Sequence, residues 1–368
     1  MDNSEKTLMF YINSLHKGGA QRVMVQLAGR FAAEGFRVLL VTSFTGENEY
    51  DVPAGVERLS IEREELAQSR IKKNISRIKA LRLLIIQYKP DTLISFMAEP
   101  NFRAVIAAFG LPVKTIVSVR NDPEKEYAGK LGRFVGKVLV PTADGCVFQT
   151  EQAKAWFPER LQRKSAVIMN QVNESFFHAE HSGERRDIVT VGRLSSQKNH
   201  AMLIRAFARI ADTVPDDLRI YGEGELENEL RGLAASLGLE DRVRFMGLSS
   251  QVAEDIKDAR LFVLPSDYEG MPNALLEAMA LGLPCISTDC PCGGPATVIR
   301  SGENGLLVPV GDEQAMSEAM LRLLRDDGFA AQLGRNAGIS AQRFLPEAVF
   351  TDWKDYIEGI IYTKETLQ

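Results

Sequence analysis

The sequence predicts an α/β protein with two doubly wound, Rossmann-like domains, and three observations lead to this prediction. A chain of 368 residues has the length of about two ordinary domains. Short apolar runs rich in β-branched residues alternate with longer segments of helical period, which is typical of parallel sheets with crossover helices. This alternation stops in a polar stretch, 170–186, and then begins again. We therefore expect one domain over 1–172, a second over 173–345, and a C-terminal helix over 346–368 that packs back across the domains.

The first half contains the elements of one complete sheet with its crossover helices. The expected strands are short and mostly apolar: Leu8–Asn13, Arg37–Ser43, Val56–Ile61, Thr92–Phe96, Thr115–Val119 and Cys146–Gln149. The expected helices are longer and carry apolar residues at helical spacing: Ala20–Ala33, Lys73–Tyr88, Asn101–Phe109 and Gly129–Val140. Gly35 lies two residues after the end of the first of these helices, where a glycine commonly ends a helix.

The second half repeats this architecture with different residues. The expected strands are Ile188–Val191, Leu218–Tyr221, Val243–Met246, Leu261–Leu264 and Pro284–Ser287. The expected helices are His200–Asp212, Leu226–Leu237, Val252–Asp258, Asn273–Ala280 and the final stretch Leu345–Tyr362. Ligands of open parallel sheets bind outside the carboxyl ends of the strands, and two such sheets that face each other leave a cleft. The turns that follow strands are therefore the places to search for functional residues.

Composition and charge exclude several classes of protein. No apolar run reaches the roughly 18 to 20 residues that span a bilayer, and the run Leu8–Ile12 is shorter than the core of a signal peptide. We therefore expect a cytoplasmic protein, in which the four cysteines are reduced thiols rather than disulfides or metal ligands. Residues 1–172 contain 25 Lys and Arg against 18 Asp and Glu, a balance of +7, whereas the remainder has a balance of −12. The acidic second half disfavours binding to nucleic acid.

A pair of glycines, Gly18 and Gly19, follows the first expected strand and precedes a helix that opens at Ala20. Glycines allow the backbone to approach a ligand closely, and the free N–H groups at a helix N-terminus suit a phosphate. The turn lacks the glycine spacing of a dinucleotide-binding fold and of a P-loop. A helix start that merely requires small residues is an equally good explanation of these glycines taken alone.

Two cations lie five residues apart in the loop after the strand that ends at Val191. Arg193 and Lys198 together are able to clamp a diphosphate and to neutralise the charge that it gains as a leaving group. A solvated loop would explain one of the two cations, but explains both less easily.

The densest signal lies between Asp267 and Glu277. Pro272 suits the first turn of a helix, so the backbone amides of Asn273, Ala274 and Leu275 are expected to be open to an anion. With a phosphate on these amides, Glu277 would accept hydrogen bonds from a ribose and Glu269 would reach the sugar beyond. The alternative is that Glu277 is an exposed helix residue, although the apolar residues around it argue against this.

Taken together, these motifs resemble those of the retaining glycosyltransferases of family four, which have the GT-B fold. By that resemblance Arg193 and Lys198 bind the donor diphosphate, and Glu277 binds the ribose. Glu269 contacts the donor sugar, and the loop of Gly18 and Gly19 closes over the phosphates and the reacting centre. The matching residues span nearly the whole chain: Gly18-Gly19-Ala20-Gln21, Gly192-Arg193-Leu194 with Lys198-Asn199, Tyr221-Gly222-Glu223-Gly224-Glu225, Glu269 to Glu277, and Gly305-Leu306-Leu307-Val308.

Two positions depart from the pattern of that family. Many relatives place a histidine near the reacting sugar after a middle strand of the first domain, and neither corresponding turn has one here. Arg120 and Asn121, in one of these turns, are the candidates for sugar or acceptor contacts. The usual Gly-Gly-Ala-Glu is Gly-Gly-Ala-Gln here, which leaves the backbone argument for this loop intact.

The resemblance implies a UDP-sugar as co-substrate and no cofactor. The Asp-x-Asp signature of metal-dependent transferases is missing from the sequence, so no metal is expected. The departing diphosphate would be neutralised by Arg193, Lys198 and helix amides instead. The segment Ser287–Pro295 is similar to members that build surface polysaccharides and often transfer hexoses or N-acetylhexosamines.

The sequence therefore indicates a retaining transfer of a hexose or N-acetylhexosamine to a hydroxyl of a growing, lipid-linked glycan. A non-catalytic, sugar-nucleotide-binding subunit of a polysaccharide assembly complex is the alternative. The basic, partly apolar segments Arg70–Lys89 and Gly129–Val140 suit an anionic membrane surface at the inner face of the cell membrane. Ordinary core packing with a solvated basic face is the competing explanation of these two segments.

Overall fold

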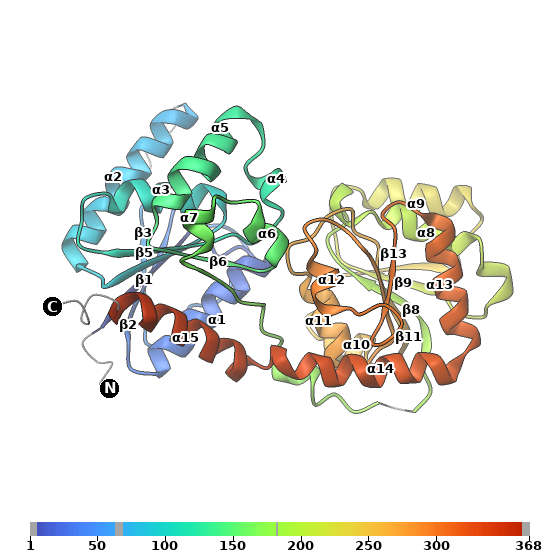
Figure 1. The fold of residues 1–368 in the computed structure, drawn as a ribbon. Helices are drawn as coiled ribbons and strands as arrows, with labels where there is room; N and C mark the ends of the chain where they lie inside the picture. Colours follow the sequence, from blue (N-terminus) through green and yellow to red (C-terminus); the bar gives the residue numbers. More distant parts are fainter. Residues whose placement is uncertain (1–5, 63–68, 182, 363–368) are drawn as a thin grey trace. The chain divides into compact units, whose positions relative to one another are not determined.

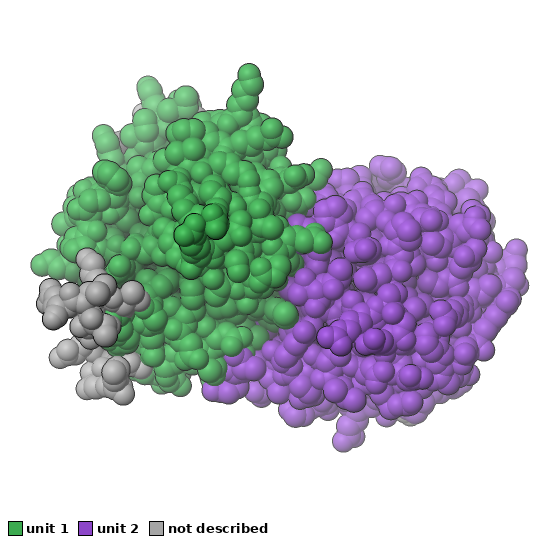
Figure 2. Space-filling view, viewed as in Figure 1, with its two compact units in different colours: residues 1–170, 349–368 green, residues 171–348 purple. Residues whose placement is uncertain are grey.

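The structure is a computed structural model that describes residues 6–62, 69–181 and 183–362. The chain forms two compact units, Met1–Asn170 with Val349–Gln368, and Gln171–Ala348 (Figure 2). Each unit contains one parallel sheet with helices on both faces, as the sequence predicts. Within the part of the chain that the structure describes, no helix combines the length and the apolar character that crossing a membrane requires.

The sheet of unit 1 has seven parallel strands in the order β3-β2-β1-β4-β5-β6-β7. Their bounds are β1 Thr7–Ile12, β2 Arg37–Thr42, β3 Val56–Ser60, β4 Thr92–Phe96, β5 Lys114–Ser118, β6 Gly145–Phe148 and β7 Ser165–Val167. The helices are α1 Gly19–Ala33, α2 Arg70–Tyr88, α3 Ala98–Ala108, α4 Pro123–Glu126, α5 Gly129–Phe134, α6 Glu151–Ala155, α7 Glu159–Gln162 and α15 Pro346–Tyr362. Each predicted strand of the first half is therefore present to within one residue at either end.

Strand β1 is buried on both faces because helices cover both sides of the sheet (Figure 1). Phe10 and its alternate neighbours pack with α1 and with Trp353 of α15, whereas Tyr11 and Met9 pack with α2 and α3. This alternation follows from the two-residue period of a strand. The ring of Trp353 stacks on Phe96 at the end of β4, with 5.6 Å between ring centroids. The C-terminal helix thus completes one face of the core of unit 1.

The sheet of unit 2 has six parallel strands in the order β10-β9-β8-β11-β12-β13. Their bounds are β8 Arg186–Val191, β9 Leu218–Tyr221, β10 Val243–Gly247, β11 Ala259–Leu264, β12 Cys285–Thr288 and β13 Leu306–Val308. The helices are α8 His200–Ala208, α9 Glu227–Ser236, α10 Val252–Ile256, α11 Asn273–Ala280, α12 Gly294–Val298, α13 Glu313–Arg325 and α14 Asp327–Ala341. This order places β8 beside β11 and β11 beside β12, so the loops after these three strands are neighbours.

Several segments differ from the prediction. The helix expected over Gly129–Val140 is α5 followed by a π-helix, Val135–Leu139, in which Gly136 lies against the ring of Trp156. The segment expected to link the domains, 170–186, includes a 3₁₀ helix, Glu174–Phe176, that contacts α11. Helices α13 and α14 were not predicted, although Asp312 and Asp326 cap them by accepting hydrogen bonds from backbone N–H groups.

Candidate functional site

The centre of the candidate site in unit 2 is an ion pair between two residues that lie 71 positions apart. Lys198 follows β8 and Glu269 follows β11, and Lys198 Nζ lies 2.5 Å from Glu269 Oε1. Ser266 Oγ donates a hydrogen bond to the same carboxylate oxygen at 2.7 Å. Thr288, at the end of β12, donates its hydroxyl to the Ser266 carbonyl and so fixes the loop from the third strand. Adjacent strand ends thus bring together two of the residues that the sequence predicts to contact the donor.

The loops that carry this pair are joined by further hydrogen bonds that do not involve it. The Asp267 backbone N–H donates to the Gln197 carbonyl at 2.9 Å, and Gln197 Nε2 donates to the Tyr268 carbonyl at 2.9 Å. Asn199 Nδ2 donates to Asp267 Oδ1 at 2.7 Å. The backbone at Lys198 and Glu269 is therefore held in register independently of their side chains.

Arg193 is placed differently from Lys198 although both lie in the same loop. Its side chain is exposed and has no hydrogen bond or ion pair with any residue that the structure describes. The loop itself is fixed, because the Gly192 N–H donates to Tyr221 O and the Leu194 N–H donates to Glu223 O, both at 2.9 Å. Gly222 has φ +133° and approaches the Gly192 carbonyl so closely that a side chain would collide with it. The exposed guanidinium thus projects from a rigid loop with its charge uncompensated.

The N-terminus of α11 lies directly after the loop that follows β11 and carries Glu269. Asn273 opens the helix after the N-cap residue Pro272, and no side chain caps it, so the N–H of Ala274 is available to a ligand. The segment after β12 holds the backbone of Glu269, because the Glu269 N–H donates to the Pro291 carbonyl at 2.7 Å.

Glu277, one turn into α11, is 6% exposed, so the alternative in which it is an exposed helix residue is wrong. Leu275, whose amide was also predicted to bind, has a fully buried side chain and donates its N–H to Pro272 O at 3.0 Å.

His200 is a buried neutral group beside the pair. It opens α8 and is 2% exposed, and its Nδ1 has no hydrogen-bond partner among the described residues. Burial, with a smaller contribution from the charge of Lys198, lowers the pKa of His200 to about 4. The sequence analysis did not select this residue, although it directly follows the Lys198-Asn199 motif.

In unit 1, the predicted glycines lie at the start of α1, after β1. The helix begins at Gly19, Gly18 is its N-cap with an extended backbone, and no side chain caps it. A side chain at Gly18 would meet the flexible end of Gln21, so the main consequence of the glycine is an open helix start. The free amides of this turn retain the capacity to bind an anion.

Arg120 is buried after β5, with 9% of its surface exposed. It donates to Asn170 Oδ1, and its guanidinium lies over the ring of Phe96 at 4.6 Å from the centroid. Burial lowers the pKa of Arg120 to about 9, and burial raises the pKa of nearby Glu126 to about 8. Asn121 is half-buried and accepts a hydrogen bond from the Asp122 N–H at 2.9 Å. The sequence analysis did not select Glu126, which ends α4 and whose Oε2 has no hydrogen-bond partner among the described residues.

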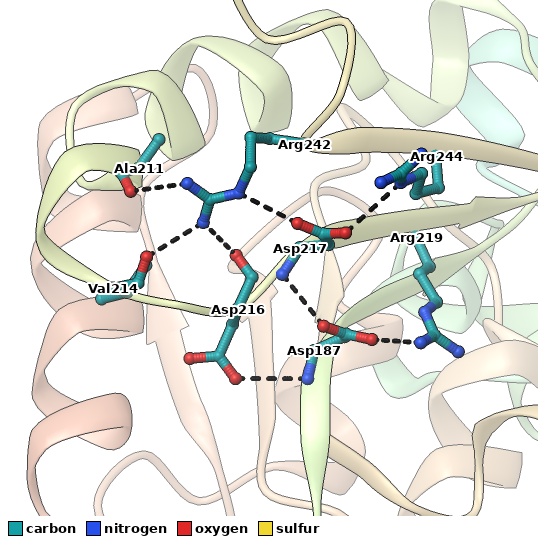
Figure 3. A network of polar contacts seen from close by, with 8 residues as sticks. All are labelled: Asp187, Ala211, Val214, Asp216, Asp217, Arg219, Arg242 and Arg244. Atoms are coloured by element: carbon teal, nitrogen blue, oxygen red, sulfur yellow. Dashed lines mark hydrogen bonds and ion pairs between the residues drawn. The ribbon is translucent and has the colours of Figure 1, made fainter.

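The opposite edge of the sheet in unit 2, at the amino ends of its strands, carries a network of charged side chains (Figure 3). Arg242 donates to Asp217 Oδ1 at 2.9 Å and to three carbonyl oxygens, and Arg244 donates to the other oxygen of Asp217 at 3.3 Å. Asp187 forms an ion pair with Arg219 and accepts the N–H of Asp217 at 3.0 Å. Each of these side chains pairs with one of opposite charge, and the contacts connect the starts of β8, β9 and β10.

Two family models match the chain. The model described as glycosyl transferases group 1 matches residues 171–338, and the model described as glycosyltransferase family 4 matches residues 17–176. The two matches overlap at residues 171–176 and together extend from residue 17 to residue 338.

Two relatives align with most of this chain. A Campylobacter jejuni protein is 28% identical over 96% of this chain and 98% of its own length; it is named GalNAc-alpha-(1->4)-GalNAc-alpha-(1->3)-diNAcBac-PP-undecaprenol alpha-1,4-N-acetyl-D-galactosaminyltransferase. An exopolysaccharide phosphotransferase from Streptomyces coelicolor is 35% identical over 75% of this chain, which spans 29% of that protein's length. The solved structure of Anabaena HepE in complex with UDP and glucose has a TM-score of 0.82 at 18% identity, covering 96% of this chain and 100% of that one.

Proposed function

Since this chain belongs to the GT-B glycosyltransferases that resemble family four, we propose that it is a retaining enzyme of surface polysaccharide biosynthesis. It moves a hexose or N-acetylhexosamine from a UDP-sugar to a hydroxyl of a growing, lipid-linked glycan. The observation that carries the proposal is the Lys198–Glu269 pair at adjacent strand ends, in the loop that precedes the uncapped helix α11. The name of the Campylobacter relative supports a lipid-linked glycan as acceptor, and the UDP and glucose in the HepE structure support a UDP-sugar as donor.

Cationic residues would bind the diphosphate of the donor, and carboxylates would bind its ribose and its sugar. Arg193, Lys198 and the amides at the start of α11 meet the diphosphate, and buried Glu277 accepts hydrogen bonds from the ribose. Glu269 meets the sugar. In unit 1, the open start of α1 at Gly18 and Gly19 offers amides to an anionic oxygen, and Asn121 and Arg120 are the candidates for sugar or acceptor contacts.

The reaction breaks the bond between the anomeric carbon and the phosphate oxygen, and the electron pair leaves with the diphosphate. The acceptor oxygen bonds to the same face of the sugar, which retains the configuration, and its proton passes to the departing phosphate oxygen. Arg193 and Lys198 stabilise the negative charge that develops on this leaving group. Because these cations and helix amides take this role, we propose that transfer requires no divalent metal. Activity should persist in excess chelator; complete loss that only added divalent metal restores would contradict this.

A panel of UDP- and GDP-sugars, assayed for slow donor hydrolysis and for transfer to lipid-linked glycans, tests the main proposal. At least one UDP-hexose or UDP-N-acetylhexosamine should be turned over. NMR of the product should show the anomeric configuration of the donor. UDP binding without turnover of any donor would instead support the non-catalytic, sugar-nucleotide-binding subunit.

We also propose that α5 and the π-helix after it rest on an anionic membrane surface. Leu131, Phe134 and Val138 are 77%, 51% and 42% exposed there, beside the exposed cations Lys130 and Arg133. The segment Arg70–Lys89 is divided instead: Leu81 and Ile85 of α2 lie in the core, as the competing explanation requires, but Ile71 and Ile75 are exposed.

Charge reversal tests this surface. Lys130→Glu with Arg133→Glu should weaken binding to vesicles that contain anionic lipid and leave donor hydrolysis unchanged. Lys137 is left intact because its ammonium already donates to the Trp156 carbonyl. Equal binding of the variant and the wild type to these vesicles would remove the membrane proposal.

A further inference from the structure

The Lys198–Glu269 pair joins two groups that the proposed function assigns to different parts of the donor. We infer that Glu269 competes with the diphosphate for Lys198, so that the site binds an intact donor more tightly than the nucleotide product. The inference rests on the proposed function and adds to it a device that favours release of the product.

The geometry supports competition because each partner has little else to satisfy its charge. The Lys198 and Glu269 side chains are 20% and 7% exposed, and Glu269 is the one carboxylate that pairs with Lys198 among the described residues. Oε1 of Glu269 receives both Lys198 and the Ser266 hydroxyl, and no described residue donates to Oε2. One carboxylate oxygen thus depends on the lysine, and the other is left for a ligand.

The charges determine which ligand can displace the lysine. A buried carboxylate that loses its counter-ion is costly unless other donors replace it. A sugar bound beside Glu269 supplies hydroxyl donors to the carboxylate and releases Lys198 to the diphosphate. A nucleotide without its sugar supplies none, so it must either leave Glu269 unpaired or bind a lysine whose charge is already neutralised.

Arg193 provides the contrast within the same loop. Its guanidinium has no counter-ion among the described residues, so a diphosphate binds it without breaking an ion pair. Arg193 should therefore contribute equally to binding of donor and product, whereas Lys198 should discriminate between them. After transfer, Lys198 returns to Glu269 and the hold on the nucleotide weakens.

The test measures UDP binding to the full-length protein by isothermal titration calorimetry. Glu269→Gln should bind UDP about tenfold more tightly than the wild type, a change of about 1.4 kcal/mol. Asp267→Asn is the matched control: it removes one negative charge two residues away that accepts from Asn199 rather than from Lys198. It should change UDP affinity less than about twofold if direct pairing, rather than the field of the site, is responsible.

A double-mutant cycle and an opposite variant complete the test. In a Lys198→Met background, Glu269→Gln should no longer tighten UDP binding tenfold, because no lysine remains to be released. Ser266→Ala removes the second donor to Oε1, strengthens the dependence of Glu269 on Lys198, and should weaken UDP binding severalfold. This variant also provides a readout if Glu269→Gln does not fold.

Three outcomes separate this inference from the proposed function. Equal UDP affinity of the wild type and Glu269→Gln, both folded, would overturn the inference alone. So would an equal gain in Asp267→Asn, or the same gain for Glu269→Gln with and without Lys198. Absence of UDP binding by the wild type would overturn the proposed function, and the inference with it.

Discussion

The two edges of the sheet in unit 2 use the same kinds of charged residue to different ends. At the amino edge, Asp187 and Asp217 face Arg219, Arg242 and Arg244, and every one of these side chains has a partner of opposite charge. At the carboxyl edge, Arg193 has none among the described residues, and Lys198 shares its charge with one buried glutamate. The difference teaches that charge remaining after internal pairing, rather than the number of charged residues, distinguishes the edge at which we propose that the donor binds.

The comparison is tested most severely at Lys198. Lys198→Met should lower turnover of a UDP-sugar by about a thousandfold, since removal of one group that stabilises a developing anion costs about 10²–10³ in rate. Steady-state kinetics with the donor identified by the panel would measure this. A loss of less than tenfold in a folded variant would show that the lysine serves mainly to neutralise Glu269.

The next effect is a pH dependence of stability at the carboxyl edge. His200 has a native pKa of about 4 against an ordinary 6.5, so the unfolded chain binds more protons between these values. Stability should therefore be complete above about pH 6.5 and fall as the pH drops towards 4, by up to about 3 kcal/mol.

Urea unfolding at several pH values would measure this dependence. His200→Phe should flatten the curve in that window, because the substituted side chain cannot take up a proton. An unchanged slope in the variant would assign the acid loss of stability to other groups.

The amino edge should respond in stability rather than in activity. Arg242 donates to one carboxylate and three carbonyl groups, so Arg242→Met leaves several acceptors unpaired. The free energy of unfolding should fall by about 2 kcal/mol, discounted because the side chain is partly exposed. Below the unfolding transition, turnover should stay within about twofold of the wild type; a hundredfold loss would contradict the separation of the two edges.

The smallest effect is expected at Arg244. Its side chain is 52% exposed and reaches Asp217 at 3.3 Å, while Arg242 holds the same carboxylate more closely. Arg244→Met should change stability by less than about 0.5 kcal/mol and leave turnover unchanged. Thermal unfolding and the same kinetic assay would detect a larger contribution, which would mean that the network acts as a unit.

Most features that depend on residues close together in the sequence were predicted, whereas features that depend on residues distant in the sequence were not. The strand Thr92–Phe96 was predicted with its observed bounds because all five of its residues are buried and most are apolar. The three-residue strands β7 and β13 are too short to show a period. Helices α13 and α14 had readable start signals in their capping aspartates, which the sequence analysis did not use.

The sequence predicted which residues belong to the candidate site, but not which of them pair with one another. Motifs identified Lys198 and Glu269, yet their ion pair depends on β8 lying next to β11, a property of the folded sheet. Arg120 was expected as a sugar or acceptor contact, and its burial against Phe96 and Asn170 depends on side chains distant in sequence. The local sequence shows which residue types lie at the strand ends. Which of their charges remain unpaired depends on the tertiary packing.

The last helix has a consequence for the order in which the protein is made. Unit 2 is contained within one continuous segment, but the core of unit 1 includes Phe350, Trp353 and Ile357, which a ribosome adds after all of unit 2. During synthesis, unit 2 can therefore reach its final packing while the core of unit 1 still lacks the helix that covers one of its faces. A nascent chain that stops short of α15 would expose the apolar side chains of α1 and β1 to chaperones or to other chains.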